Sequence, residues 1–583
     1  MRLSSIRIAT GLSCLLFGAA AWRLGPHSSS DLAEAQTSQA LKTTAGSPAT
    51  AASLHSAKAT VPNTAKPATL PEPKLVAAPG TEIYTAKRGE AIPTIAHRYI
   101  ARTSYLTSTE LSEAIRAANH KSDGSNILKA NEEIIIPGIL SAPIVEKTIP
   151  VAKDFEVRAV YLTGFMAGSD KGLRVIRHWR EVGGNSVVFD IKDSDGSVTI
   201  AWDHPLLGEH PVYLHDVPKF VHFLHQQNMH AIARIAIFRD ERLVVQHPEL
   251  AVQSRKNKTA WRENGKLVWT DPSNPKVQDY DIALAKHVAQ LGVDEIQFDY
   301  VRFPAEGDQK DAAFVFQNGI DPNAANNDPC SNSRPGCPAQ AKPSRPAETS
   351  APEARSPKPE AESADTKPRA KGKNSKSTTE SRKPKADPQP RGPQRSDVIT
   401  AFLKKAYAEL HPTGVLLSLD VFGVMAWQRQ VDLSHTGQDI VGMAHYCDVL
   451  SPMIYPSHFF GMDNIEHPGD EPAHFIGESM DRFELITKGS GVIIRPWLQA
   501  FHWRTKTYSP EYIKIQVETA RAKGGIGFLF WNAANDYSKP FVAMPEMKEA
   551  DAKEAKDKPK YFRGDELHAP SVQAALTQQP ATH

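Results

Sequence analysis

The sequence contains few cysteines and has a net charge close to zero. Each of these features argues against a class of function. Only four of the 583 residues are cysteine, and none stands in a CxxC pair or a Cys/His cluster with metal-ligand spacing, which argues against a structural zinc site. The formal net charge is +2, so we expect no nucleic-acid partner. No GxGxxG motif follows the first predicted strand of the large domain, which weakens a dinucleotide-binding fold. We expect no metal and no cofactor.

Large hydrophobic residues are few in three stretches, and these stretches divide the chain. Residues 25–80 are rich in Ala, Ser, Thr, Pro and Lys and poor in aromatics, and Ala339 to Arg395 contain no Val, Ile, Leu or aromatic residue. Such segments cannot bury enough apolar surface to fold. We therefore predict a disordered linker over 25–80, a disordered insertion over 306–397 and a disordered tail over 549–583.

The first 24 residues have the pattern of an export signal. Arg2 and Arg7 precede an apolar run from Ile8 to Trp22, which is shorter than the roughly 20 residues of a membrane span. We predict a signal peptide or membrane anchor over 1–24 and an exported protein that is periplasmic, envelope-associated or secreted. Cys330 and Cys337 lie close together in one loop, where a disulfide is reasonable in an exported protein.

Residues 81–140 have the composition of a small α+β unit. A strand-like run at Ile83 to Thr85 is followed by two helical patterns, the second over Leu111 to Asn119, and by a closing strand, EEIIIP. This strand–helix–helix–strand order resembles a LysM domain, and the matching residues are Tyr84, Gly89, Ile92, Ile95, Ala96, Asn119 and Ile134 to Pro137. The resemblance implies binding of N-acetylglucosamine polymers such as peptidoglycan. A spacer of the same shape without sugar binding is the alternative.

Two stretches of the chain, 155–305 and 398–548, alternate between strand-like and helical patterns. Helical patterns lie between several of the strands, for example at Gly172–Val182, Val277–Leu291 and Pro510–Lys523. Eight strands is the number that closes a parallel (β/α)₈ TIM barrel of the α/β class, although an open doubly wound sheet has the same alternation. The eight predicted strands are Val157–Gly164, Ser186–Ile191, His230–Phe238, Asp294–Phe303, Val415–Phe422, Val449–Tyr455, Gly491–Leu498 and Gly525–Trp531.

The fourth predicted strand carries the most informative residues. In VDEIQFDYVRFP, from Val293 to Pro304, alternation places Gln297, Asp299 and Val301 on one face and bulky residues on the other. The bulky face suits packing under helices, and Asp299 then lies near the carboxyl end of the strand. In (β/α)₈ barrels that end forms the active site.

Polar and aromatic side chains recur at the same place on the other strands. Gathered at one mouth, they form a polar cup ringed by aromatics, which suits a polysaccharide substrate. The predicted binding residues are Asp190, Lys192, Arg234, Arg302, Tyr455, His458, Arg495, Trp497, Gln499, Trp531 and Asn532. Glycoside hydrolysis needs two carboxyl groups, and Asp299 and Asp420 end neighbouring strands. A structural ion pair, for example of Asp299 with Arg302 or Arg234, is the alternative for each acid.

The two barrel stretches together resemble a family of bacterial (β/α)₈ glycosyl hydrolase domains that is distantly similar to the α-amylase clan. The residues that carry the resemblance are Tyr161–Thr163, Phe189–Lys192, Ala233–Ile235, Phe238–Asp240, Phe298–Pro304, Asp420–Gly423, Ser451–His458, Arg495–Gln499 and Gly527–Asn532. In the clan the fourth-strand acid is the nucleophile and a fifth-strand acid donates the proton. The resemblance thus implies that Asp299 is the nucleophile and Asp420 the acid/base, although Asp420 stands where the clan has Glu.

Three functions remain open at this point. The first is an exported glycoside hydrolase that residues 81–140 tether to a cell-wall or extracellular polysaccharide. The second is a catalytically inactive polysaccharide-binding or envelope scaffold protein on a barrel fold. The third, deacetylation or amide cleavage, would need a metal triad, and the sequence shows none.

Overall fold

The computed structural model describes residues 76–121, 124, 126–318 and 392–554. Its main body is a closed parallel barrel in the strand order β3-β4-β5-β9-β11-β12-β14-β15. The ring closes because β15 pairs with β3 and β11 pairs with both β9 and β12. The predicted (β/α)₈ fold is confirmed.

The strands are short and match the predicted runs to within two residues, except that β9 ends at Asp299, four residues before the predicted end at Phe303. Their bounds are β3 (Val157–Leu162), β4 (Ser186–Lys192), β5 (His230–Ala236), β9 (Glu295–Asp299), β11 (Leu416–Phe422), β12 (Val449–Ile454), β13 (Ile493–Ile494), β14 (Trp497–Gln499) and β15 (Gly527–Trp531). β13 and β14 are two pieces of one barrel strand, since both pair with β12.

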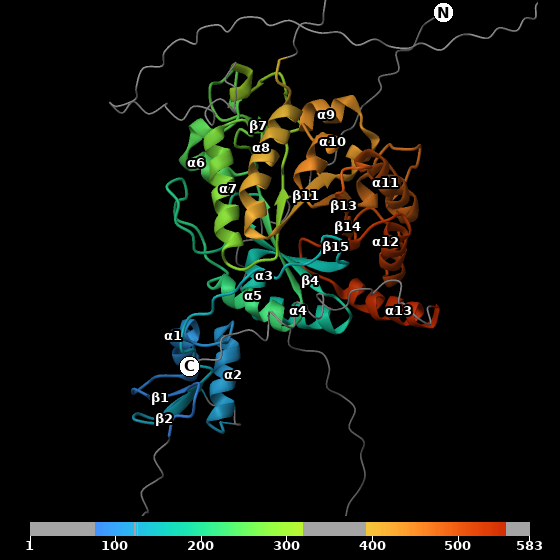
Figure 1. The fold of residues 1–583 in the computed structure, drawn as a ribbon. Coiled ribbons are helices and arrows are strands. Elements are labelled where there is room, and N and C mark those ends of the chain that lie inside the picture. The colour runs from blue at the N-terminus through green and yellow to red at the C-terminus, as the bar shows by residue number, and fades with distance from the viewer. Residues whose placement is uncertain (1–75, 122–123, 125, 319–391, 555–583) are drawn as a thin grey trace, which may run out of the picture.

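Helices cover the ring on its outer side (Figure 1). The longer ones are α4 (Asp170–Glu181), α5 (Val217–Gln226), α7 (Pro275–Ala289), α8 (Arg395–Leu410), α11 (Pro472–Thr487), α12 (Pro510–Ala522) and α13 (Ser538–Glu554). Their starts follow local sequence rules. Ser169, Asp216 and Ser509 each cap a first turn by accepting a backbone N–H, and Pro218 and Pro510 stand in first turns where no N–H is needed.

The apolar residues of the barrel strands divide into two cores, one on each side of the strands. Ile296 and Phe298 belong to the large core between the strands and the helices. A smaller core fills the barrel interior and includes Val188, Ile232 and Leu529. This division confirms that period-two alternation sorts the side chains of β9 as far as Asp299.

The segment of residues 148–155, the strap, leads into β3 and closes the floor of the barrel. Ile149 and Phe155 on this strap belong to the interior core. The backbone N–H of Ile149 donates to Asp294 Oδ1 at 2.8 Å, and Thr148 Oγ1 donates to the carbonyl of Val293 at 2.8 Å. The strap therefore seals the end of the barrel at which the strands begin.

The N-terminal unit has the predicted strand–helix–helix–strand order. It consists of β1 (Thr81–Thr85), α1 (Ile92–Tyr99), α2 (Ser108–Ala118) and β2 (Glu133–Pro137), and β1 and β2 pair antiparallel. The unit packs on the barrel beside α4 and α5 (Figure 1): Glu110 of α2 pairs with Arg177, and Lys219 Nζ donates to the Ile100 carbonyl at 3.0 Å. Its membership of the LysM family and its sugar binding remain predictions.

Two short antiparallel strand pairs lie between β5 and α8. β7 (Arg262–Glu263) and β8 (Leu267–Val268) form a hairpin, and β6 (Gln253–Ser254) pairs with β10 (Ala312–Ala313). The predicted insertion of 306–397 therefore begins with folded residues as far as 318, and α8 starts at Arg395 within its end. α13 likewise extends past the predicted end of the barrel to Glu554.

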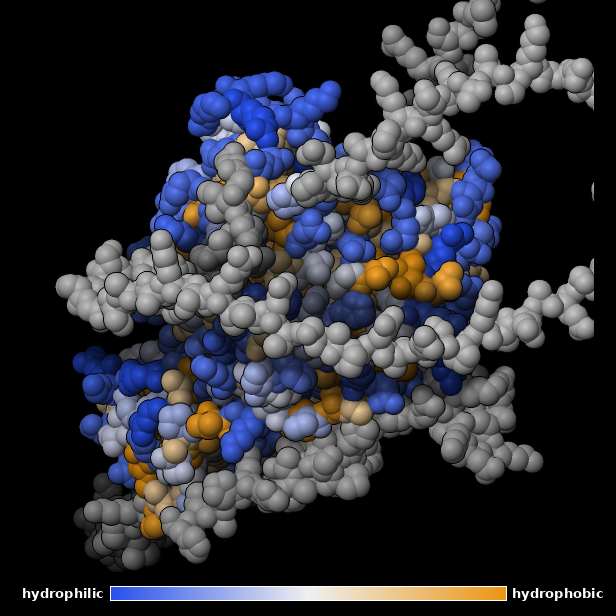
Figure 2. Space-filling view, turned by 45° about the horizontal axis from the view of Figure 1, so that its top comes forward, coloured by the Kyte–Doolittle hydropathy of each residue, from blue (hydrophilic) through white to orange (hydrophobic). Residues whose placement is uncertain are grey.

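Several predictions fall outside the described residues: the signal or anchor at 1–24, nearly all of the linker, the tail from 555 and the Cys330–Cys337 pair. Cys447 is free and buried. Within the described ranges no helix is long and apolar enough to cross a membrane. The face in Figure 2 is mainly hydrophilic.

Candidate active site

Arg234 on β5 joins the acids of two other strands at the carboxyl ends of the barrel strands. Its Nη1 donates to Asp190 Oδ1 of β4 at 2.5 Å. Its Nε and Nη2 both donate to Asp299 Oδ2 of β9, at 3.2 and 2.5 Å. All three residues are almost fully buried, and charge-assisted hydrogen bonds of this kind fix both carboxylates firmly.

Asp420 on β11 is the neighbour of Asp299 on the other side. The parallel register pairs Leu419 with Phe298, the residues just before the two acids, so both acids occupy matching positions on adjacent strands. Asp420 Oδ2 lies 4.0 Å from Arg234 Nε. The structure thus brings Asp190, Arg234, Asp299 and Asp420 together.

The predicted alternation on β9 stops at Asp299. Tyr300 has a φ of 55°, a left-handed conformation that bulky residues rarely adopt. As a consequence Val301 packs in the core between strands and helices, and its predicted position in the barrel interior is wrong. The turn at Tyr300 leaves Asp299 as the last residue of the strand.

Asp420 differs from Asp299 in its surroundings. Trp497 Nε1 of β14 donates to Asp420 Oδ1 at 2.7 Å. Burial, reinforced by the negative charge of Asp299, raises the pKa of Asp420 well above its ordinary value, although Arg234 and the Trp497 hydrogen bond oppose the shift. A carboxyl group with a raised pKa is suited to donate a proton at neutral pH.

Asp190 has a further partner on β3. The Tyr161 hydroxyl donates to Asp190 Oδ2. Burial raises the pKa of Asp190 to about 7, and the charge of Arg234 lowers it only in part. Because both oxygens of Asp190 are occupied by Tyr161 and Arg234, its evident task is to hold the guanidinium in place.

Aromatic residues form the other half of the mouth, on β12, β14 and β15. The Trp531 ring stacks on Tyr161 with centroids 4.1 Å apart. Tyr455 lies edge-on to Phe501 at 5.6 Å, and the acids Asp420 and Asp299 reinforce burial in raising the pKa of Tyr455. Three predicted residues, Tyr455, Trp497 and Trp531, therefore lie beside the acids.

His458 continues this aromatic half outward. Its ring lies 5.4 Å from Tyr455 and 4.7 Å from Trp503. Burial and the positive charge of Arg504 lower the pKa of His458 to about 4, so the imidazole is neutral at pH 7. A neutral ring next to tryptophan suits contact with a sugar.

Lys192 does not join the site. Its Nζ lies 2.9 Å from Asp240 Oδ2 and 2.7 Å from Asp281 Oδ1 of α7, and it is fully buried there. The register of β4 and β5 shifts between Asp190 and Lys192, and this irregularity turns Lys192 away from the interior.

Arg495 and Arg302 are near the site but outside the acid cluster. Arg495 lies deeper in the barrel, where its Nη1 lies 3.0 and 2.9 Å from the two oxygens of Glu295. Arg302 is packed between the rings of Trp269 and Phe422, 4.5 Å from each. Asp299 therefore pairs with Arg234 and has no ion pair with Arg302.

Gln499 and Asn532 brace the loops of the mouth. Gln499 accepts from the backbone N–H of Ser457 at 3.2 Å and donates to the Phe501 carbonyl at 3.0 Å. Asn532 donates to the Ala500 carbonyl at 2.6 Å. With their amides engaged by backbone, these residues position the aromatic loops.

Three residues of the mouth were not among the predicted site residues. Tyr161 binds Asp190, Tyr300 turns the chain after Asp299, and half-buried Asp193 is close enough to influence Asp190 and Arg234. Tyr161 is the third interior residue of its strand, so alternation alone would have indicated it.

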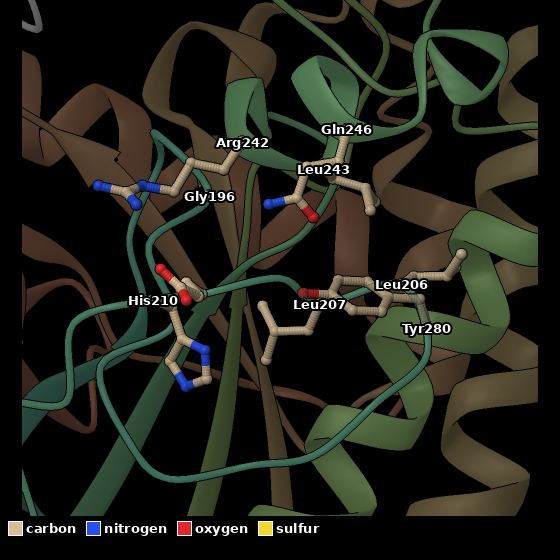
Figure 3. A pocket seen from close by; sticks show the side chains of 9 residues that line it. Gly196, Leu206, Leu207, His210, Arg242, Leu243, Gln246 and Tyr280 are labelled. Atoms are coloured by element: carbon tan, nitrogen blue, oxygen red, sulfur yellow. The ribbon is translucent and has the colours of Figure 1, made fainter.

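A small hollow outside the ring is separate from this site (Figure 3). It lies between the loop after β4, α6 (Glu241–Gln246) and α7, and none of the clustered acids lines it. Its lining includes Leu206, His210, Arg242, Gln246 and Tyr280.

Residues 159–537 match a protein-family model described as "Putative glycosyl hydrolase domain". The match covers most of the chain and both halves of the barrel. The chain belongs to this family. The barrel is therefore a glycosyl hydrolase domain, and the protein is a glycoside hydrolase.

A search of solved structures found proteins that are similar to parts of this chain. A hypothetical protein from Ruminiclostridium thermocellum ATCC 27405 is 36% identical over 28% of this chain and 85% of its own, with a TM-score of 0.25. The PgaB (BpsB) glycoside hydrolase domain from Bordetella bronchiseptica is 12% identical over 67% of this chain and 98% of its own, with a TM-score of 0.41. A comparison with curated proteins found no match.

Proposed function

We propose that this glycoside hydrolase cleaves a polysaccharide by a two-carboxylate mechanism in which Asp299 is the nucleophile and Asp420 the general acid. One observation carries the assignment: Arg234 gives two hydrogen bonds to Asp299, while its nearest contact with Asp420 is 4.0 Å. The guanidinium thus holds Asp299 directly in one position. Asp420 is buried with a raised pKa, which favours its protonated form.

The step that breaks the glycosidic bond uses both Asp420 and Asp299. Asp420 transfers its proton to the glycosidic oxygen as the bond from that oxygen to the anomeric carbon breaks, and an oxygen of Asp299 bonds to the anomeric carbon. In the second step Asp420, now a carboxylate, takes a proton from water, and the water oxygen displaces Asp299. The sugar rings stack on the aromatic half of the mouth, beside Trp531 and Tyr455.

The neighbouring positions of the acids support retention of configuration. Adjacent parallel strands are about 4.8 Å apart, and retaining glycosidases have carboxyl groups about 5–5.5 Å apart. Matched positions on β9 and β11 therefore favour the shorter, retaining separation. A nucleophilic role for Asp299 requires the same outcome.

The proposal extends to the substrate and the place of action. The export-like segment 1–24 supports an exported enzyme, and the resemblance of 81–140 to LysM supports attachment to a polymer that contains N-acetylglucosamine. Contacts such as Glu110 with Arg177 hold that unit against the barrel. The substrate is accordingly a cell-wall or extracellular polysaccharide, with peptidoglycan the first to test.

A polysaccharide panel tests the function. The full chain is incubated with peptidoglycan, chitin, cellulose, xylan and polygalacturonate, and new reducing ends are measured. The variant with both Asp299→Asn and Asp420→Asn serves as the blank. We expect the wild type alone to release reducing ends. Equal release by wild type and double variant would overturn the proposal. So would the absence of release from every polymer with which the protein co-sediments.

A further inference from the structure

Two arginines flank the tyrosine that follows Asp299. Arg239 Nη1 donates to the Tyr300 hydroxyl at 2.9 Å, and the Arg239 guanidinium lies 5.2 Å from the centre of the Tyr300 ring. The Arg302 guanidinium lies 5.7 Å from the centre of the same ring. One phenol, immediately beyond the proposed nucleophile, is thus held between two positive charges.

Neither arginine forms an ion pair within the described part of the chain. No carboxylate oxygen of the described residues lies within 4.0 Å of a guanidinium nitrogen of Arg239 or Arg302. Arg302 is only 2% exposed, and its Nη2 has no hydrogen-bond partner. Its Nη1 donates to the Phe303 carbonyl at 3.0 Å. Burial accordingly lowers the pKa of Arg302.

Glu263, the acid whose charge acts most strongly on Arg302, accepts hydrogen bonds from other groups. One of its oxygens accepts the backbone N–H groups of Ala305 and Glu306, at 2.9 and 2.8 Å. The other accepts the Trp269 indole N–H at 2.9 Å. Glu263 therefore influences Arg302 through space without forming an ion pair with it.

Arg234 makes the contrast clear. It lies in the same mouth, and carboxylates of Asp190 and Asp299 neutralise it. A buried guanidinium without such a partner is unfavourable. Stacking between Trp269 and Phe422 accounts for the position of Arg302. Half-buried Arg239 lies over the Tyr300 ring, and among the described residues its side-chain hydrogen bond goes to the Tyr300 hydroxyl.

We propose that Arg239 and Arg302 form an anion subsite, and that the sugar bound against Asp299 carries a negatively charged substituent such as a carboxylate. This inference rests on the proposed glycosidase function of the mouth. The clustered acids repel an anion, so the charged substituent points toward Tyr300 and away from Asp190. Charge-assisted hydrogen bonds to Arg239 supply most of the selectivity.

Matched sugars that differ in one acidic group test the subsite. Binding of glucuronate against glucose, galacturonate against galactose, and N-acetylmuramate against N-acetylglucosamine is measured calorimetrically on the full chain at low salt. We expect at least one acidic sugar to bind about tenfold or more tightly than its neutral partner. High salt should reduce this preference.

Three variants locate the effect. Arg239→Met should abolish the preference while neutral sugars bind as before, and Arg239→Lys should keep part of it. Arg504→Met is the matched control, because Arg504 also belongs to the mouth but stacks on Phe460 and Trp503, 3.9 and 4.6 Å away; it should keep the preference. Circular dichroism verifies that each variant is folded.

The outcomes separate the subsite from the enzyme function. Equal or weaker binding of every acidic sugar, or a preference that survives in Arg239→Met, would overturn the subsite. If reducing ends are released from a neutral polymer while no acidic preference exists, the subsite alone fails. If neither hydrolysis nor sugar binding occurs, both proposals fail.

Discussion

Arg234 gives two hydrogen bonds to a single oxygen of Asp299, from Nε at 3.2 Å and from Nη2 at 2.5 Å. The same guanidinium holds Asp190 through Nη1, so its planar fork sets the position of Asp299 relative to a fixed point on β4. Asp420 lies beyond this fork, at 4.0 Å from Nε. The asymmetry gives two similar acids different roles.

Arg234→Met should impair both activity and stability. It leaves two buried carboxylates without their partner, which typically costs about 3–5 kcal/mol, and it frees Asp299 to move, which we expect to reduce kcat/KM by about 10²-fold or more. Denaturant unfolding and steady-state kinetics measure the two effects. Arg234→Lys is the control: it keeps the charge without the fork, so stability should recover more than activity. Turnover of Arg234→Met near the wild-type rate would contradict the positioning role.

Asp420→Asn should lose the ability to protonate a leaving group. We expect kcat/KM, which reports the first bond-breaking step, to fall by about 10²–10⁴-fold on a natural glycoside, and to fall far less on a dinitrophenyl glycoside, whose leaving group needs no proton. The measurement is the ratio of the two rates in wild type and variant. An equal loss on both substrates would mean that Asp420 has a different role.

Trp497→Phe should move the pH profile of the enzyme. The Trp497 hydrogen bond lowers the pKa of Asp420, so its removal raises that pKa further. The acid then remains protonated to higher pH, and the alkaline limb of kcat should shift to higher pH. Trp179→Phe is the control, since its indole donates to the Arg158 carbonyl at 3.0 Å, outside the mouth. An unshifted limb in Trp497→Phe would contradict the assignment.

Much of this site follows from period-two alternation and from the convergence of parallel strands. Asp190, Asp299 and Asp420 end apolar runs, and the closed barrel brings them together as expected. Lys192 shows where the rule fails: a register shift after Asp190 sends it outward to Asp281. Nothing in its local sequence marks that shift, because the residues on either side suit a regular strand.

Depth and packing of the loops were also beyond the reach of the sequence. Alternation places Arg495 and Trp497 on the same face of the strand, and Arg495 was predicted to bind substrate. It lies instead one layer of side chains deeper in the barrel than Trp497, against Glu295. The layer of the barrel interior that a side chain occupies depends on the stagger between neighbouring strands. This stagger is determined only when the strands pair in the folded chain. Gln499 and Asn532, also predicted to bind substrate, lie at the mouth, where their amides bind backbone of the neighbouring loops.

His225 should make the free energy of unfolding depend on pH, because its ring pairs with Glu146 and Asp294. Burial opposes its charge, but Asp294 and Glu146 outweigh burial and raise the pKa of His225 from 6.5 to about 9. Protonated His225 therefore contributes stability that is complete below pH 6.5 and is lost as pH rises to about 9. Glu146, whose pKa is lowered to about 2 against burial by hydrogen bonds from His222 and His225, contributes stability that is lost as pH falls below 4.5.

The check is the free energy of unfolding between pH 5 and 9. In the wild type it should fall by about 1–3 kcal/mol between pH 6.5 and 9, and His225→Gln should remove most of that fall. His178→Gln is the control, because exposed His178 forms its ion pair with Glu181 on the surface of α4, away from Glu146 and Asp294. A wild-type stability that is constant across this range would contradict the role of His225.

Asp299 remains the residue on which the account depends. The most direct measurement is the rate at which Asp299→Asn releases reducing ends from the best polymer of the panel, compared with the wild type, with unfolding followed on the same samples. We predict a loss on the order of 10⁴-fold or more with the fold intact. A folded Asp299→Asn that retains the wild-type rate would contradict the assignment of Asp299 as the nucleophile.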